Sequence, residues 1–118
     1  MKKSEHLQLG KRGEDAAEEF LLAKGFHILF RNYRFQKAEV DIVASYNNLL
    51  VLIEVKTRRS NNFGNPEEFV SKRKQELFYE ASEEFLTEHQ LDYEVRFDVV
   101  SIIGTNPPFE IEHIEDAF

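Results

Sequence analysis

Three carboxylates and a lysine occupy two neighbouring apolar runs of the sequence. Glu39 and Asp41 alternate with apolar residues, and Glu54 and Lys56 follow a run of five apolar residues. Residues two apart on a β-strand point to the same face of the sheet, so each of these pairs would share a face. A carboxylate inside an apolar strand is costly unless it is paired, hydrogen-bonded or bound to a cation. We therefore interpret the four side chains as parts of one site.

The turn between the two runs indicates which side chains meet. Asn47 and Asn48 separate the runs, and asparagine tolerates the positive φ that a tight hairpin requires. In such a hairpin Asp41 and Glu54 come within reach of one divalent cation, and Mg²⁺ or Mn²⁺ prefers oxygen ligands. Lys56 would orient or activate a water and stabilise charge on a phosphate. This is the chemistry of metal-assisted phosphodiester hydrolysis.

A plainer interpretation treats the same residues as surface ion pairs on an edge strand, with Lys56 neutralising one carboxylate. Two observations favour the metal site instead. Five apolar residues precede Glu54, and the second carboxylate pair lies just across the turn.

Four other charged residues could serve the site. Glu14 lies at the margin of the apolar stripe of the first expected helix, as an additional ligand or acceptor or as an exposed acid. Lys74 falls inside the apolar stripe of the second helix, where it would snorkel to solvent, contact a phosphate or pair with a site carboxylate. Arg58 and Arg59 lead from the strand into a polar loop, which suits binding to a phosphate backbone.

The charge distribution leaves a polyanionic partner open. The net charge is −7, yet residues 1–77 carry 14 Lys and Arg against 11 Asp and Glu, whereas residues 78–118 carry one Arg against 11 acids. Basic residues also cluster, as around Arg34, and local fields steer polyanions more than the total charge does. The acidic end is either a solvated face or a surface for another protein.

Length and composition predict one soluble domain over residues 1–118. The chain has no cysteine, which excludes disulfides, zinc–thiolate sites and thiol catalysis. It has no apolar run of about 18 residues and no signal-peptide core, so we expect a cytoplasmic protein without a membrane partner.

The periodicity predicts an α/β domain with the element order α-β-β-β-α-β-β. Ser4 is the expected cap of the first helix and Gly25 its stop, and the second helix is expected to start at Asn65-Pro66-Glu67-Glu68 and to carry Val70 on its apolar stripe. The third strand should be central, and parallel to the fourth through a crossover helix. The expected strands are 26–35, 38–46, 49–57, 93–103 and 109–114.

Seven short motifs in order along the chain resemble the YraN-like family of the restriction-endonuclease-like superfamily, to which archaeal Holliday-junction resolvases also belong. They cover residues 10–100, so the resemblance spans most of the chain. Each motif alone is weak, but the ordered set is specific. The motifs are Gly10-x-x-Gly13-Glu14-x-x-Ala17, Phe20-Leu21 to Gly25, Asn32-Tyr33-Arg34, Glu39-Val40-Asp41-Ile42-Val43-Ala44, Glu54-Val55-Lys56-Thr57-Arg58, Val70-x-x-x-Lys74-x-x-x-Leu77 and Arg96-Phe97-Asp98-Val99-Val100.

The resemblance implies a restriction-endonuclease-like fold, with a central mixed β-sheet flanked by helices. It also implies a nuclease site in which Asp41 and Glu54 bind the metal, Lys56 is the catalytic lysine and Glu14 the supporting helical acid. Resolvases of this fold act as dimers, which makes a homodimer an expectation here. One departure is Ala38, where the family usually has glycine, and its methyl group is expected to crowd the backbone near the site.

Together these patterns predict a Mg²⁺- or Mn²⁺-dependent endonuclease acting on DNA, in branched or single-stranded form. The predicted catalytic residues are Asp41, Glu54, Lys56 and Glu14, with Glu39 in support. The predicted nucleic-acid contacts are Arg34, Arg58, Arg59 and Lys74. Two alternatives stay open: a nucleic-acid-binding or adaptor module that keeps the fold without turnover, and a protein-interaction domain that uses the acidic residues 78–118.

Overall fold

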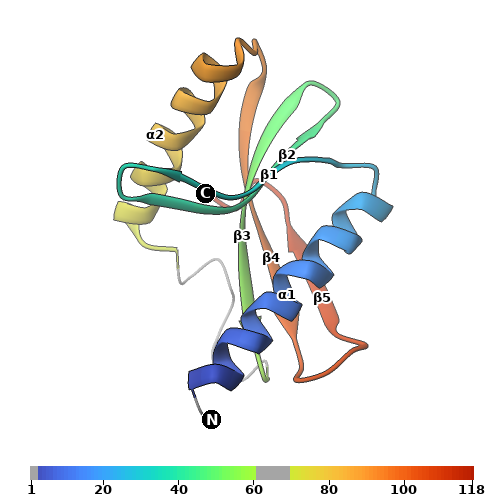
Figure 1. Cartoon of the computed structure of the whole chain (residues 1–118). Coiled ribbons are helices and arrows are strands. Elements are labelled where there is room, and N and C mark those ends of the chain that lie inside the picture. The colour runs from blue at the N-terminus through green and yellow to red at the C-terminus, as the bar shows by residue number, and fades with distance from the viewer. Residues whose placement is uncertain (1–2, 61–69) are drawn as a thin grey trace.

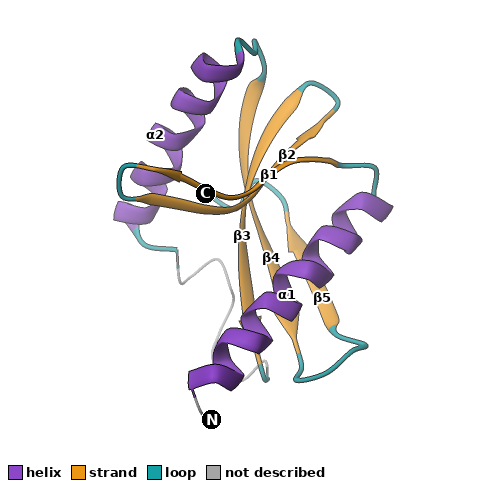
Figure 2. Cartoon of the chain, in the orientation of Figure 1, coloured by secondary structure: helices purple, strands orange, loops and turns teal. Residues whose placement is uncertain are grey.

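A five-stranded mixed sheet with one helix on each face forms the structure, a computed structural model that describes residues 3–60 and 70–118 (Figures 1 and 2). The order α-β-β-β-α-β-β agrees with the prediction and is compatible with a restriction-endonuclease-like fold. No helix among these residues is long and apolar enough to cross a membrane. The elements are α1 (Lys3–Ala23), β1 (His27–Phe35), β2 (Ala38–Tyr46), β3 (Leu49–Arg58), α2 (Lys72–His89), β4 (Glu94–Ile103) and β5 (Glu110–Ile114).

The strands lie in the order β1-β2-β3-β4-β5, so β3 is central as predicted. Asn47 and Asn48 connect β2 to β3 with φ values of 48° and 64°, the positive φ that a tight antiparallel hairpin needs. β3 and β4 are parallel, joined through α2, and the other neighbouring strands are antiparallel. The predicted hairpin and the predicted crossover are therefore both confirmed.

Each helix buries an apolar stripe against its own face of the sheet. Ala17 and Leu21 of α1 pack in one buried cluster with Ile53 of the central strand. Phe78 and Phe85 of α2 belong to a second buried cluster on the opposite face. Each apolar stripe forms one continuous surface because residues three or four apart on a helix lie on one side of it.

The helix ends differ in part from the prediction. α1 ends before Gly25, whose φ of 97° and the bond from Phe26 N–H to the Leu21 carbonyl close the helix, as predicted. Its start is earlier than expected: Ser4 lies within the helix, which begins at Lys3, so the prediction that Ser4 caps it is wrong.

The second helix begins at Lys72, where Ser71 is the N-cap and its hydroxyl accepts the Lys74 N–H at 3.1 Å. The predicted start at Asn65-Pro66-Glu67-Glu68 lies outside the described residues. Val70 precedes the helix rather than lying on it, because the extended Ser71 cap (ψ 158°) interrupts helical geometry there, although Val70 is buried as expected.

The sheet forks next to the pair formed by Ile42 and Ile53. Residues 38–40 of β2 pair with β1 alone, and residues 54–58 of β3 pair with β4 alone. Figure 1 shows the turn between β1 and β2 projecting toward α2, away from the lower half of β3. The register places Asn32 of β1 across from the position of Asp41, and its φ of 55° is a left-handed conformation that asparagine tolerates. Asn32 therefore lies opposite the point where β2 leaves β3, whereas the register shift of β1 lies earlier, between Ile28 and Phe30.

Candidate active site

Asp41 lies in the fork of the sheet and bridges its two branches. Its Oδ2 accepts the backbone N–H of Val55 at 2.8 Å. This side-chain bond links β2 to β3 just beyond Ile42 and Ile53, the last paired residues of the two strands. Asp41 is therefore placed on the β3 side of the fork, next to Glu54.

Glu54 is 5 % exposed and is held by two ammonium groups. Lys74 Nζ lies 2.6 Å from Glu54 Oε1, and Lys56 Nζ lies 3.6 Å from the same oxygen. The contact with Lys56 confirms that Glu54 and Lys56 share a face of β3. Two cations at one buried carboxylate offset much of the cost of burying its charge.

The negative charge of Asp41 is less well neutralised by neighbouring groups than that of Glu54. Burial, followed by repulsion from Glu54, raises the pKa of Asp41 to about 7, against the lowering effects of the Val55 N–H and Lys74. Glu14 also raises the Asp41 pKa, which places all three acids in one electrostatic cluster. Burial is the main cause of this shift, and a strongly shifted pKa beside other charged groups marks Asp41 as a candidate functional residue.

Glu14 reaches the cluster from α1, on the other side of the fork. A methyl group at Gly13 would overlap the Thr57 side chain, so the missing side chain lets α1 approach β3 closely at this point. Burial raises the pKa of Glu14, while Arg31 lowers it and Asp15 and Glu54 raise it further. Glu14 Oε1 is buried and has no hydrogen-bond partner among the described residues.

A cavity of about 190 Å³ opens beside these carboxylates. Glu39 and Asp41 both line it, as expected from their shared strand face, and Lys37 lines it as well. The charge pattern of the sequence grouped Lys37 with Arg31 and Arg34 but did not assign it to the site. The lining residues are Lys37, Glu39, Asp41, Glu54, Lys74, Leu77 and Phe78.

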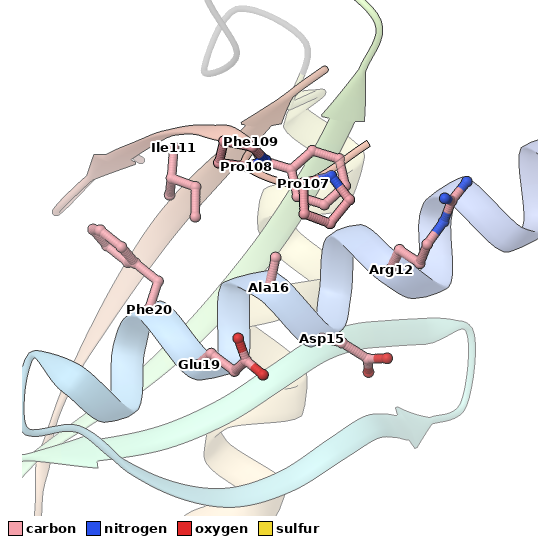
Figure 3. A pocket seen from close by; sticks show the side chains of 9 residues that line it. All are labelled: Arg12, Asp15, Ala16, Glu19, Phe20, Pro107, Pro108, Phe109 and Ile111. Atoms are coloured by element: carbon pink, nitrogen blue, oxygen red, sulfur yellow. The ribbon is translucent and has the colours of Figure 1, made fainter. Parts of the chain in front are cut away.

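A larger groove, of about 530 Å³, lies elsewhere on the molecule. Figure 3 shows Ala16 and Phe20 of α1 facing Pro107, Pro108, Phe109 and Ile111 across it. Its walls are mainly apolar and include none of the predicted site residues. The predicted chemistry therefore belongs to the smaller, polar cavity.

The four residues predicted to contact nucleic acid lie at different places relative to the cavity. Arg34 forms an exposed ion pair with Glu39, at 3.3 Å, on the β1–β2 branch of the fork. Arg58 ends β3 and Arg59 is exposed just after it. Of the roles left open for Lys74, the structure brings it to a site carboxylate. Arg58 and Arg59 lie four and five residues beyond Glu54 and outside the residues that line the cavity.

Ala38 lies in the core of the protein. It is 1 % exposed and packs in the buried cluster under α2, at the first position of β2. Its methyl group therefore fills core volume, and the expected crowding of the backbone near the site stays a prediction.

The donor set suits a hard divalent cation. Asp41 and Glu54 offer carboxylate oxygens across the fork, and the Glu14 oxygen that lacks a partner in the described chain is a further acceptor. Within residues 3–60 and 70–118, no group of three or more acidic or histidine side chains is close enough to enclose an ion. Mg²⁺ commonly binds through one or two carboxylates and keeps several waters, so two ligands are sufficient for it.

Comparison with known proteins relates this chain to one protein family. Residues 13–102 match the family described as Uncharacterised protein family UPF0102. The chain belongs to this family. A UPF0102 protein of Flavobacterium psychrophilum is 49% identical, over 98% of this chain and 97% of its own length. UPF0102 proteins of Christiangramia forsetii and Bacteroides thetaiotaomicron are 48% and 44% identical, again over 98% of this chain and over 97% and 95% of their own lengths. The YraN-like resemblance is thus confirmed for this UPF0102 protein.

Proposed function

We propose that this UPF0102 protein is a divalent-metal-dependent endonuclease that hydrolyses phosphodiester bonds of DNA, in branched or single-stranded substrates. The observation that carries the proposal is the fork of the sheet, where Asp41 and Glu54 line one cavity, two lysines contact Glu54, and the charge of Glu14 acts on Asp41. The raised pKa of Asp41, caused first by burial and then by repulsion from Glu54, supports this proposal.

In this proposal Asp41 and Glu54 hold Mg²⁺ or Mn²⁺. When bound, the ion supplies Lewis acidity toward a phosphate oxygen and a more acidic water. The residues around it orient the substrate. Lys56, already 3.6 Å from Glu54, is placed to stabilise the charge that develops on the phosphate, and Glu14 accepts a hydrogen bond from the attacking water.

DNA would be held by the basic residues on both branches of the fork. Arg34 and Lys37 lie on the β1–β2 branch, and Arg58 and Arg59 at the end of β3. Arginine suits phosphate oxygens because its guanidinium group offers paired donors. A homodimer would present two such sites, and sedimentation of the purified protein measures whether one forms.

Cleavage of labelled branched, flapped and linear DNA in Mn²⁺ tests the proposal. The wild-type protein should cut at least one substrate, and Asp41→Asn and Glu54→Gln should each reduce the rate by at least about 100-fold, because both remove a metal ligand. Glu94→Gln is the matched control: Glu94 is exposed at the start of β4 and pairs with Leu49 at the start of β3, away from the fork, so its variant should retain most of the activity. Cleavage that survives Asp41→Asn would rule out the assigned site.

The second candidate is a nucleic-acid-binding module without turnover. The ion pair between Lys74 and Glu54 favours it, because that contact balances a site charge without any metal. This candidate predicts salt-sensitive DNA binding that depends on Arg58 and Arg59 and no cleavage in Mn²⁺ or Mg²⁺. The same assay, combined with a measurement of DNA binding, separates the two candidates.

A further inference from the structure

Lys74 and Glu54 form the shortest ion pair of the candidate site. The 2.6 Å between Lys74 Nζ and Glu54 Oε1 is a charge-assisted hydrogen bond, whereas the 3.6 Å to Lys56 Nζ is longer than a hydrogen bond. Lys74 also lowers the pKa of Asp41, so its charge acts on both predicted metal ligands. In the protein without metal, Lys74 is therefore the main cation at the fork.

Because of its position on α2, the positive charge of Lys74 needs the negative charge of Glu54 to balance it. Lys74 lies in the first turn of the helix, which contains no acid and follows the Ser71 cap. The N-terminus of a helix carries partial positive charge, so an ammonium group there is unfavourable unless an anion balances it. Arg73 forms an ion pair with Glu76, one turn along the same helix, whereas Lys74 forms its ion pair with Glu54 across the cavity.

A divalent cation held by Asp41 and Glu54 would share the Glu54 carboxylate with Lys74, whose ammonium group contacts Oε1. A divalent ion and an ammonium group on one carboxylate lie close enough to repel each other strongly. Lys74 would then have to leave Glu54, and its side chain, 35% exposed at the cavity, has room to do so. The displaced ammonium and the helix N-terminus beside it would both need a new anion.

We propose that Lys74 is an exchangeable counter-ion: it neutralises Glu54 in the metal-free protein, yields Glu54 when the metal binds, and then contacts a phosphate of the DNA. This inference rests on the proposed function. It assigns Lys74 a positioning role that couples the two binding events, so that metal strengthens DNA binding and DNA strengthens metal binding by the same factor.

Binding of Mn²⁺ alone, measured by calorimetry at about pH 8, where Asp41 is largely ionised, tests the first half. Removing the competing charge with Lys74→Met should tighten Mn²⁺ binding about tenfold. Lys74→Arg keeps the charge and should stay close to wild type. Arg73→Met removes a neighbouring charge that is paired with Glu76 and should change Mn²⁺ affinity less than about twofold.

Equal or weaker Mn²⁺ binding by Lys74→Met, in a protein whose thermal unfolding shows it to be folded, would overturn the inference. Lys74→Gln provides the same comparison if the methionine variant does not fold. A wild-type protein that binds no Mn²⁺ would overturn the proposed function itself, and the inference with it. Wild-type binding that is lost in Asp41→Asn, combined with an unchanged Lys74→Met, would overturn the inference alone.

The second half of the proposal, the contact of Lys74 with a DNA phosphate, is tested by measuring the affinity for labelled branched DNA. The affinity in Ca²⁺, a hard cation of the same charge, is compared with the affinity in EDTA. The wild-type protein should bind the DNA more tightly in Ca²⁺, and Lys74→Met should lose most of that gain. Arg73→Met should match wild type in the ratio of the two affinities, even if loss of a positive charge weakens DNA binding in both conditions. A full Ca²⁺ gain in Lys74→Met would refute the phosphate contact.

Discussion

At the scale of single residues, the site is a balance between three acids and two lysines around one fork. Glu54 is stabilised by Lys56 and Lys74, whereas Asp41 accepts the Val55 N–H and carries a pKa of about 7. Ionising the Asp41 carboxyl group in the folded protein is therefore unfavourable, first because it is buried and then because Glu54 repels the charge. Such a cost is typical of functional sites, because the group is arranged for a ligand rather than for stability.

Replacing Asp41 by asparagine should stabilise the folded protein while removing a metal ligand. The wild-type pKa is raised from about 4 to about 7, so folding favours the protonated form, and that stabilisation is lost as pH rises through about 7. Asparagine is neutral and can still accept the Val55 N–H. In EDTA at about pH 8, Asp41→Asn should exceed wild type by about 1–3 kcal/mol in the free energy of unfolding, with little difference near about pH 4.

Chemical denaturation at the two pH values measures this difference. Glu39→Gln, an exposed carboxylate on the same strand, is the control and should change stability by less than about 0.5 kcal/mol. A wild-type protein more stable than Asp41→Asn at the higher pH would contradict the charge balance described for the fork.

Metal affinity should depend on pH for the same reason. Asp41 must lose its proton before its oxygens can bind a cation, so Mn²⁺ binding should release a proton and strengthen by about tenfold between about pH 6 and about pH 8. Calorimetry in buffers of different ionisation enthalpy counts the released protons. Mn²⁺ affinity that is flat across this range would exclude Asp41 as a ligand.

At the scale of elements, close approach of α1 to β3 brings Glu14 to the fork. Gly13 is the contact point, since a methyl group there would lie 2.9 Å from Thr57 Cγ2 and closer still to its hydroxyl. A methyl group at Gly10, one turn earlier, would meet no described atom within 4 Å. The same substitution at Gly10 and at Gly13 therefore tests a free and a crowded position of one helix.

Gly13→Ala and Gly10→Ala should therefore have opposite effects. Gly10→Ala should stabilise the protein by about 0.5–1 kcal/mol, because alanine favours helix more than glycine does. Gly13→Ala should destabilise it by about 1–3 kcal/mol, because Thr57 or the helix must shift. Thermal unfolding of the two variants measures this contrast. Stabilisation by both would show that α1 does not depend on this approach.

A second cluster fixes β4, β5 and the end of the chain. Asp98 is fully buried and accepts bonds from Arg96, from His113 and from the Asp116 N–H. Burial alone would raise the Asp98 pKa, but these donors outweigh it and hold the pKa below its usual value. Because the folded pKa is lowered, this stabilisation is present above about pH 4 and is lost as pH falls through the folded pKa.

Asp98→Asn should cost about 2–4 kcal/mol at neutral pH, since it removes the charge that Arg96 and His113 share. It should also flatten the loss of stability in acid. Urea denaturation between about pH 3 and about pH 7 measures both effects. An unchanged acid transition in Asp98→Asn would mean that other carboxylates govern it.

At the scale of the whole molecule, the order of elements and the central position of β3 could be predicted because apolar alternation and the Asn47-Asn48 turn are local signals. The pairing of Glu54 with Lys56 followed from strand parity alone. The fork could not be predicted, because it depends on where two strands separate in space, which no local pattern of the sequence indicates. For the same reason the sequence left the partner of Lys74 open and did not assign Lys37 to the cavity, since both meet the site only through tertiary packing.

We propose that the fork of the sheet binds a divalent metal ion. The most direct measurement is anomalous scattering from a crystal soaked in Mn²⁺. We expect a peak within about 2.5 Å of carboxylate oxygens of both Asp41 and Glu54, with the Lys74 ammonium withdrawn from Glu54. A peak elsewhere, or no peak while Lys74 stays bound to Glu54, would contradict this claim.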